Sequence, residues 1–211
     1  TFESVWLTEV LTERIAAGVA VTMLLEGGDV TDQGLWCCHQ IAAAGGKVLF
    51  MHNDPAVDIF DRYTDLHAKF AIVDGERIAV STENPGNHAM PVDEKSNGTA
   101  GNRGLLLITD QQDVIDYVTS IHKRDCDPDH HADIVAYGAV PRYQVPVDYT
   151  AAYSTGGGGY SYMAPFSTTV PAFEADRFEI VHSPETSLDP EDGLIGLVLS
   201  AGAGDAVYVE Q

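Results

Sequence analysis

The chain has 211 residues, 45% of them hydrophobic, and its 32 acidic residues against 11 basic ones give a formal net charge of −21. This size and apolar content suffice for a packed core in one large domain or two small ones. No apolar run approaches the roughly 18 residues of a membrane-spanning helix, so we expect no spanning segment. Residues 1–10 lack a signal-peptide pattern, and a cytoplasmic and an exported location both stay open.

The first quarter of the chain alternates helix and strand patterns. Apolar residues recur at near-helical spacing over 3–17, and Gly18 follows as a C-cap glycine would. Asp29 or Thr31 can cap a second helix, which a glycine pair near residue 45 ends. The elements expected here are a helix over 3–17, a buried strand over 19–25, a helix from about 31 to 44 and a strand over 47–51.

Two β-rich runs, 66–74 and 77–82, follow, and the two residues between them predict a hairpin. Residues two apart on a strand leave the same face, so His67 and Lys69 are expected to project together from one side of the first run. The other side of that run is apolar. A strand over 103–109 and a helix over about 111–124 come next, and the alternation of elements predicts an α/β fold in which helices sandwich a mixed sheet.

The periodicity fades after residue 125. A stretch rich in Pro, Tyr and Gly then runs to about 176, and it predicts a long irregular connection. Order resumes with a strand pattern at 177–184, a helix near 192–201 and a strand at 205–211. We therefore divide the chain into a first unit over 1–125, an irregular connection over 126–176, and the start of another α/β unit over 177–211.

Three polar residues of the hairpin form a set suited to one chemistry. His67, Lys69 and Asp74 have the spacing H-x-K-x4-D. Cleavage of a phosphodiester requires an in-line nucleophile, cations or donors at the nonbridging oxygens, and an acid for the leaving alkoxide. A neutral His67 imidazole can attack phosphorus to give a phosphohistidine, and the Lys69 ammonium beside it can neutralise the developing charge.

This spacing resembles the signature of the phospholipase D superfamily, H-x-K-x4-D-x6-G-[GS]-x-N. Ser81, Thr82, Glu83 and Asn84 follow Asp74 at the matching distance, although Ser81 stands where the family usually has Gly. The resemblance implies a phospholipase D-like α/β/α sandwich that works without a metal or another cofactor. It also implies that Asp74 orients a histidine of the site, and that Thr82 and Asn84 donate hydrogen bonds to phosphate or to catalytic groups, in a pocket that Ser81 narrows.

A site of this family needs two such motifs, with one histidine as the nucleophile and the other as general acid and then base. The chain contains one motif, so we expect the second to come from a further part of the protein or from another chain, as in a homodimer. By the same comparison, 1–125 resembles a first repeat that lacks its opening elements and 177–211 resembles the opening of a second repeat. We expect 178–211 to dock onto the first unit, within one chain or exchanged between two.

The substrate class and the source stay open. The resemblance fits nucleic acid or phospholipid, and we slightly favour a nuclease because no basic amphipathic helix suited to a membrane surface is visible. A noncatalytic module that binds a phosphate-bearing ligand is the alternative. The composition, with 20 Asp, 12 Glu and four Lys, resembles proteins of salt-loving archaea, although an acidic mesophilic protein fits too. Molar salt shortens the Debye length to roughly 3 Å and would screen repulsion of a phosphate polymer.

The other candidate residues are expected to be structural. The acidic run at 125–133 lacks the central Gly and closing Glu of a calcium loop, so we expect a solvated loop rather than a metal site. The tyrosines after residue 140 are expected to cover a domain edge rather than to stack on bases. The cysteines are expected to be buried thiols, with a bridge through Cys126 left open. Histidine 39 is expected to be a core or surface residue, and the same reading is preferred for 52 and 88, which could instead line the pocket. The cysteines are Cys37, Cys38 and Cys126, and the histidines are His39, His52 and His88. The tyrosines are Tyr143, Tyr149, Tyr153, Tyr160 and Tyr162.

Overall fold

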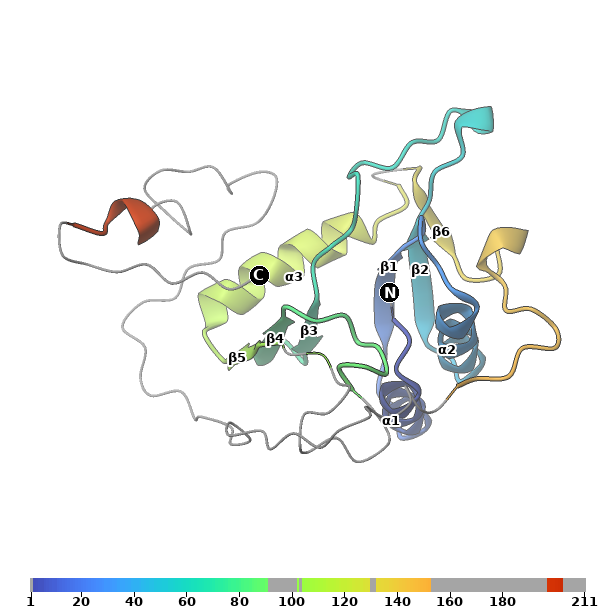
Figure 1. Ribbon diagram of the computed structural model, residues 1–211, viewed down its shortest axis with the longest axis horizontal. Helices are drawn as coiled ribbons and strands as arrows, with labels where there is room; N and C mark the ends of the chain where they lie inside the picture. The colour runs from blue at the N-terminus through green and yellow to red at the C-terminus, as the bar shows by residue number, and fades with distance from the viewer. Residues whose placement is uncertain (1, 91–101, 103, 130–131, 153–196, 203–211) are drawn as a thin grey trace, which may run out of the picture.

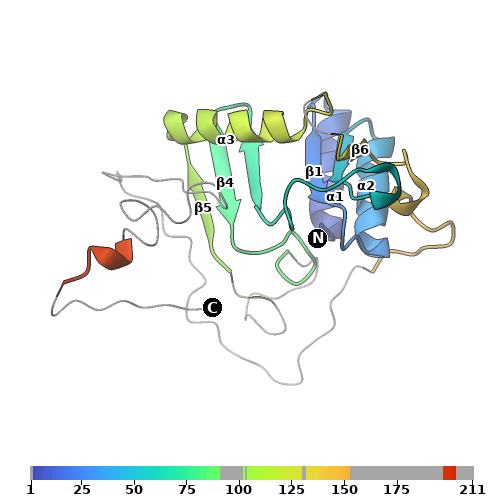
Figure 2. The same ribbon diagram turned by 90° about the horizontal axis from the view of Figure 1, so that it is seen from above.

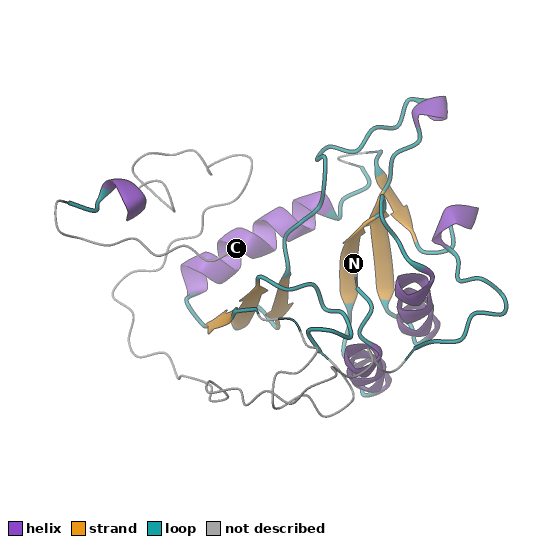
Figure 3. Cartoon of the chain, in the orientation of Figure 1, coloured by secondary structure: helices purple, strands orange, loops and turns teal. Residues whose placement is uncertain are grey.

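The computed structural model describes residues 2–90, 102, 104–129, 132–152 and 197–202, which have mixed α/β content (Figure 1). Figure 3 shows how helices and strands alternate along this part of the chain. The helices are α1 (Val5–Ala16), α2 (Asp32–Ala43) and α3 (Gln112–Asp125), and two 3-10 turns lie at Pro55–Val57 and Pro141–Tyr143. The strands are β1 (Thr22–Glu26), β2 (Lys47–Met51), β3 (Phe70–Val73), β4 (Arg77–Ser81), β5 (Leu106–Thr109) and β6 (Ile134–Ala136).

The strands form two sheets of three. In the first, β1 and β2 are parallel, and β6 pairs antiparallel with the other edge of β2. In the second, β3, β4 and β5 form an antiparallel meander. Figures 1 and 2 show the two sheets side by side, with β3 on the side of β1. Within the described residues, no strand ladder connects one sheet to the other.

The ends of the first two helices follow the capping signals of the sequence. Ser4 caps α1 by accepting a hydrogen bond from the Leu7 N–H, and Thr31 caps α2 by accepting one from the Gly34 N–H. Gly18 has a φ of +94°, which glycine adopts without steric cost, and its N–H donates to the Ile15 carbonyl. The predicted helices over 3–17 and 31–44 are therefore confirmed, with their ends shifted by one or two residues.

The core of the first sheet lies between α2 on one face and the end of α3 on the other. Val48 and Phe50 of β2 pack against α2, whereas the alternate residues Leu49 and Met51 point to the opposite face. On that opposite face they meet Cys126, at the end of α3. α3 also covers the second sheet, over which it runs in Figure 2. Among the described residues, no helix has both the length and the apolar character needed to cross a membrane.

The pairing of β3 with β4 decides which of their side chains face α3. Phe70, Ile72, Ile78 and Val80 lie in one cluster with the apolar side of α3. The alternate residues of both strands leave the opposite face of the sheet. Burial by α3 does not extend to β5, since all four residues from 105 to 108, which are Leu105, Leu106, Leu107 and Ile108, are exposed.

Three strands begin later than predicted, and sequence reasoning missed a fourth. β1 begins at Thr22 rather than at residue 19, β3 begins at Phe70 rather than at 66, and β5 begins at Leu106 rather than at 103. Residues 134–136, within the stretch expected to be an irregular connection, form β6, and the nearby Tyr143 is fully buried. Three residues are too few to show an alternating pattern, so the long-range pairing with β2 determines this strand.

The expected second unit falls mainly on residues that the structure does not describe. Its strands at 177–184 and 205–211, and with them the expected docking of 178–211, lie outside the described residues. Residues 197–199 are helical, within the helix expected near 192–201.

Candidate functional site

The motif-bearing hairpin is closed by a turn whose residue types fit its backbone. Asp74 and Gly75 have φ values of 53° and 70°, both in the left-handed region, and the Glu76 N–H donates to the Val73 carbonyl over 3.0 Å. Glycine adopts this conformation freely and aspartate tolerates it better than most residues do. The pairing then runs from Val73 opposite Arg77 to Phe70 opposite Val80, so the predicted hairpin is confirmed.

The turn separates Asp74 from the other two motif residues. Lys69 precedes β3 and Asp74 follows it, five residues later. At about 3.3 Å per residue, the two α-carbons lie roughly 16 Å apart along the strand. Asp74 is also exposed. The structure therefore does not bring Asp74 together with His67 and Lys69, and its visible contribution is to the turn.

Lys69 lies next to β4 at the open end of the hairpin. The Ser81 N–H donates to the Lys69 carbonyl over 2.8 Å, which extends the β3–β4 pairing by one residue. Residues opposite each other in such a pair share a face, and here that face is the one turned away from α3. Burial lowers the pKa of Lys69 below its ordinary value, and the charge of Glu83 offsets only part of this lowering. The two effects act on the same ammonium group.

His67 is exposed and lies just before the paired part of the hairpin. The Leu66 N–H donates to Oε2 of Glu26, at the end of β1, over 2.8 Å. This bond turns the chain toward the first sheet and explains why β3 begins only at Phe70. His67 is thus held between two fixed points, the Leu66 bond to Glu26 and the pairing of Lys69 with Ser81. Neither His67 nor Lys69 is packed inside the core.

The residues expected to support a phosphate follow β4. Ser81 Oγ accepts a hydrogen bond from the Glu83 N–H over 3.0 Å, so its side chain is engaged in the local turn. Thr82 Oγ1 accepts from the Leu105 N–H over 2.9 Å, which leaves the hydroxyl proton to donate elsewhere. Asn84 is exposed. Ser81 and Lys69 are therefore brought together, while Thr82 and Asn84 lie one and three residues beyond Ser81.

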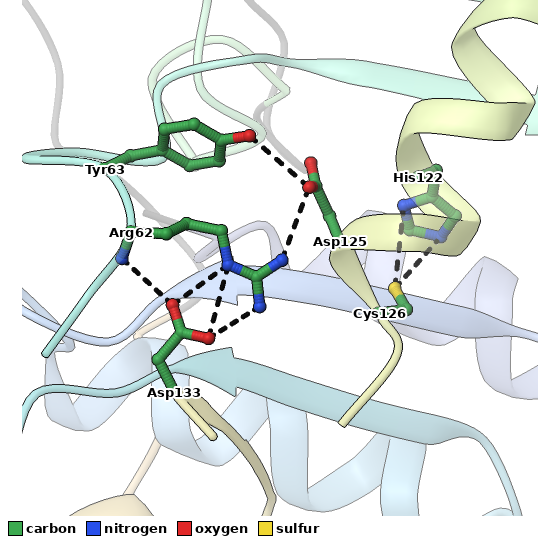
Figure 4. A network of polar contacts seen from close by, with 6 residues as sticks. All are labelled: Arg62, Tyr63, His122, Asp125, Cys126 and Asp133. Carbon is green, nitrogen blue, oxygen red and sulfur yellow. Dashed lines mark hydrogen bonds and ion pairs between the residues drawn. The ribbon is translucent and has the colours of Figure 1, made fainter. Parts of the chain in front are cut away.

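A buried ion-pair network, shown in Figure 4, fixes the loop that leads to His67. Arg62 donates from Nε and from an Nη to the carboxylate of Asp133, at 3.0 Å and 2.6 Å, and its backbone N–H binds the same carboxylate at 3.0 Å. A second Nη lies 3.5 Å from Oδ1 of Asp125, as does the hydroxyl of Tyr63. Because these groups come from the loop, the end of α3 and the start of β6, the network connects three parts of the fold.

The stability of the chain is expected to fall in acid because of this network. Burial alone would raise the pKa of Asp133, but hydrogen bonds from the side chain and backbone of Arg62 outweigh it and hold the pKa below its usual range. A depressed carboxyl pKa stabilises the fold above the unfolded pKa, about 3.9, and this contribution disappears as the pH falls through the folded value. Urea unfolding from neutral pH down to about pH 3 measures it. Equal acid sensitivity in Asp133→Asn would contradict the assignment.

The other candidate residues have structural surroundings. Cys37, Cys38 and Cys126 are free and buried, as predicted. Burial raises the pKa of Cys37 to about 11, of Cys38 to about 12 and of Cys126 to about 11, so these thiols are poor nucleophiles at neutral pH. His52 is buried, and its Nδ1 lies 3.1 Å from the Tyr143 hydroxyl. His39 is exposed and lies against Tyr137, while His88 is exposed.

The acidic run near residue 127 shows only local bonding where it is described. The Asp129 N–H donates to Asp127 Oδ1 over 3.0 Å. In the part of the chain that the structure covers, no group of three or more His, Cys, Asp or Glu side chains is placed to hold a metal ion. Tyr149 is partly buried, and its hydroxyl donates to Gln33 Oε1 over 2.6 Å. His130, His131, Tyr153, Tyr160 and Tyr162 lie outside the described residues.

Sequence reasoning missed two residues near the site. Glu83 occupies the variable position of the signature, and only its charge beside Ser81 and Asn84 could have drawn attention to it. Arg62 lies five residues before His67, and nothing in the spacing pairs it with Asp133, 71 residues later.

No family model, no curated protein and no solved structure matches the chain. The class that the fold defines is therefore an α/β protein with one mixed and one antiparallel sheet.

Proposed function

We propose that this α/β protein is a phosphodiesterase of the phospholipase D type, with the hairpin end at His67 and Lys69 as one half of its active site. The observation that carries the proposal is the motif on this hairpin: Lys69 is paired with Ser81, and an exposed His67 lies two residues before it. Helix α2 on one face of the first sheet, with the end of α3 at the other face, is compatible with the sandwich that the resemblance implies. Phosphodiesters of nucleic acid are the preferred substrates over phospholipids.

In the proposed reaction, a nitrogen of the His67 imidazole attacks phosphorus and a P–N bond forms as the P–O bond to the leaving group breaks. The leaving alkoxide takes a proton from the acid of the second motif. Water then attacks the phosphohistidine, the P–N bond breaks, and the same group, now a base, takes the proton from water. Lys69 stabilises the charge on the nonbridging oxygens, and the Thr82 hydroxyl and the Asn84 amide are the neighbouring donors.

The second motif is proposed to come from a further part of the protein or from another chain. One imidazole cannot act as the nucleophile and also protonate the leaving group in the same step. Turnover is therefore expected only from an assembly that holds two motifs, and in the two-chain case from a homodimer. Asp74 is proposed to act through the turn of the hairpin, because it lies at the far end of β3.

Substitution of His67 tests this proposal. We expect the intact protein in molar KCl to cleave DNA, RNA or phospholipid vesicles, and His67→Ala to reduce that activity to background, because the nucleophile is gone. His39→Ala removes an exposed histidine of α2 and is expected to leave activity unchanged. Labelled phosphate should remain on the protein after an alkaline quench and disappear in His67→Ala. Full activity in His67→Ala would remove the nucleophile assignment.

A noncatalytic phosphate-binding module is the second candidate, and it is favoured by the presence of a single motif in these 211 residues. Ser81 at the usual glycine position points the same way, because its hydroxyl is engaged with the Glu83 N–H. Binding of inorganic phosphate by the intact protein, lost in Lys69→Ala and accompanied by no cleavage of the three substrates, would favour this candidate over the enzyme.

A further inference from the structure

Glu26 has no role in the proposed reaction, yet its carboxylate joins the end of β1 to the segment that carries His67. Glu26 is the last residue of β1, and the parallel pairing places it opposite Met51 of β2. Its carboxylate oxygen Oε2 accepts a hydrogen bond from the Leu66 N–H over 2.8 Å. Leu66 immediately precedes His67 in the chain. A side chain of the first sheet therefore holds the main chain next to the proposed nucleophile.

The second carboxylate oxygen of Glu26 is bonded as well. Oε1 accepts from the Gly28 N–H over 2.6 Å, within the bend of residues 27–29 that follows β1. Arg142 holds the same bend, because one of its Nη atoms donates to the Gly28 carbonyl over 2.7 Å. Both carboxylate oxygens thus accept from main-chain N–H groups, which fixes the direction in which the Glu26 side chain points.

The contact with Leu66 is more protected from water than the contact with Gly28. The Leu66 bond is partly buried, whereas the Gly28 bond is exposed. The Leu66 side chain also packs against the buried cluster of Leu49, Met51, Cys126 and Ile134. Water can therefore replace the carboxylate at Gly28 more readily than at Leu66. Loss of the Glu26 side chain is expected to act mainly on the segment before His67.

A short exposed bridge lies between this contact and the hairpin. On its far side, the Ser81 N–H donates to the Lys69 carbonyl over 2.8 Å. The bridge consists of residues 67 and 68, and both are exposed. Because consecutive α-carbons lie about 3.8 Å apart, a shift of the Leu66 backbone is passed directly to His67. The pairing at Lys69 continues the second sheet, so it does not depend on Glu26.

We infer that Glu26 is a positioning residue for the nucleophile, which sets where the His67 imidazole lies relative to a phosphate at Lys69. The inference rests on the proposed function, because that function makes His67 the nucleophile. In-line attack needs the reacting atoms about 3–3.5 Å apart, and a misplacement of about 1 Å can cost roughly 100-fold in rate. Glu26 acts here as a hydrogen-bond acceptor, through its bond to the Leu66 N–H.

Kinetics of the intact protein separate positioning of His67 from binding of the substrate. We expect Glu26→Ala to lower kcat by about 10- to 100-fold, because the imidazole is no longer held for attack. KM and the binding of inorganic phosphate, which depend on Lys69, should change by less than about twofold. Glu26→Gln loses the charge but keeps an oxygen that can accept the Leu66 N–H, so it should retain at least roughly half of the activity.

Exchange of the Leu66 amide with solvent deuterium tests the contact without any need for turnover. The Leu66 N–H should exchange faster in Glu26→Ala than in the unsubstituted protein, and the backbone NMR order parameter of His67 should fall. Glu9→Ala is the matched control, because Glu9 is an exposed glutamate of α1. It is expected to leave the Leu66 exchange rate and kcat unchanged.

Two results would overturn the inference. One is a Leu66 exchange rate that is the same in Glu26→Ala as in Glu9→Ala. The other is an equal loss of kcat in Glu26→Gln and Glu26→Ala, since the charge rather than the hydrogen bond would then matter. Failure of the proposed function gives a different result: if His67→Ala retains full activity while Glu26→Ala still speeds the Leu66 exchange, the nucleophile assignment fails and Glu26 still fixes this segment.

Discussion

Replacement of Asp133 by alanine is expected to lower the free energy of unfolding by about 3–5 kcal/mol, the usual cost of breaking a buried ion pair. The Arg62 and Asp133 side chains are only 9% and 2% exposed, so the substitution leaves a largely buried guanidinium without its main partner. The Arg62 backbone N–H loses its acceptor as well. Urea unfolding at neutral pH measures the loss as a decrease in the midpoint at constant slope.

Two further variants show whether the loss of stability comes from breaking the ion pair or from removing any carboxylate in this part of the chain. Asp129→Ala removes an exposed carboxylate four residues earlier and should change stability by no more than about 0.5 kcal/mol. The double variant Arg62→Leu/Asp133→Leu removes both charges, and it is expected to recover much of the loss. If Asp133→Ala and Asp129→Ala were equally stable, the network would have no measurable role in holding the loop before His67.

Replacement of Tyr143 by alanine is the second change with a large expected effect, also about 3–5 kcal/mol, because it empties a fully buried aromatic site. The Tyr143 ring stacks on Phe50 with 4.3 Å between centroids and an interplanar angle of 10°. Its hydroxyl lies 3.1 Å from His52 Nδ1 and donates to the Gly27 carbonyl over 3.3 Å. Denaturant unfolding of the variant measures the loss.

Tyr143→Phe is the matched control, because it keeps the ring and removes only the hydroxyl. Its expected cost is about 1–2 kcal/mol, since His52 and the Gly27 carbonyl lose a buried partner. Gly27 also shows how closely this site is packed: a Cβ there would lie 2.1 Å from the Met51 carbonyl oxygen and 2.3 Å from the Tyr143 hydroxyl. A loss in Tyr143→Ala no larger than in Tyr143→Phe would contradict the packing argument.

Local signals in the sequence were enough to predict the first two helices and the hairpin. The α2 cap at Thr31, the glycine after α1 and the β2 strand over Lys47–Met51 each depend on neighbours within a few residues. The hairpin is local too, because its turn needs two residues that tolerate a positive φ. Such features follow from residue type and spacing alone, without knowledge of the tertiary contacts.

The features that sequence reasoning missed depend on contacts between distant residues. β6 exists because Ile134–Ala136 pairs with β2, about 85 residues earlier. The start of β3 is displaced because Leu66 binds Glu26, which is 40 residues away. Arg62 and Asp133 carry ordinary charges that, in the sequence alone, fit a solvated loop equally well. Only the fold shows that they are buried together.

The candidate site also has features that the sequence predicted and features that only the fold shows. His67, Lys69 and their two-residue spacing were visible in the sequence, and so was the small residue at Ser81. Asp74 is separated from Lys69 because β3 lies between them. The spacing of a sequence motif does not show this distance in space. Glu26 could not be assigned a role until its bond to Leu66 was seen.

The absence of a strand ladder between the two described sheets has a consequence for the opening motions of the molecule. The β1–β2–β6 unit and the β3–β4–β5 unit are joined through side chains, through α3 and through the loop before His67, rather than by rows of backbone hydrogen bonds between strands. We expect packed units of this kind to open as separate cooperative blocks, each with its own free energy of opening. Amide protons of the parallel pair and of the meander should therefore exchange with solvent deuterium in two distinct groups, and the block that carries Lys69 can open while the Phe50 core stays closed.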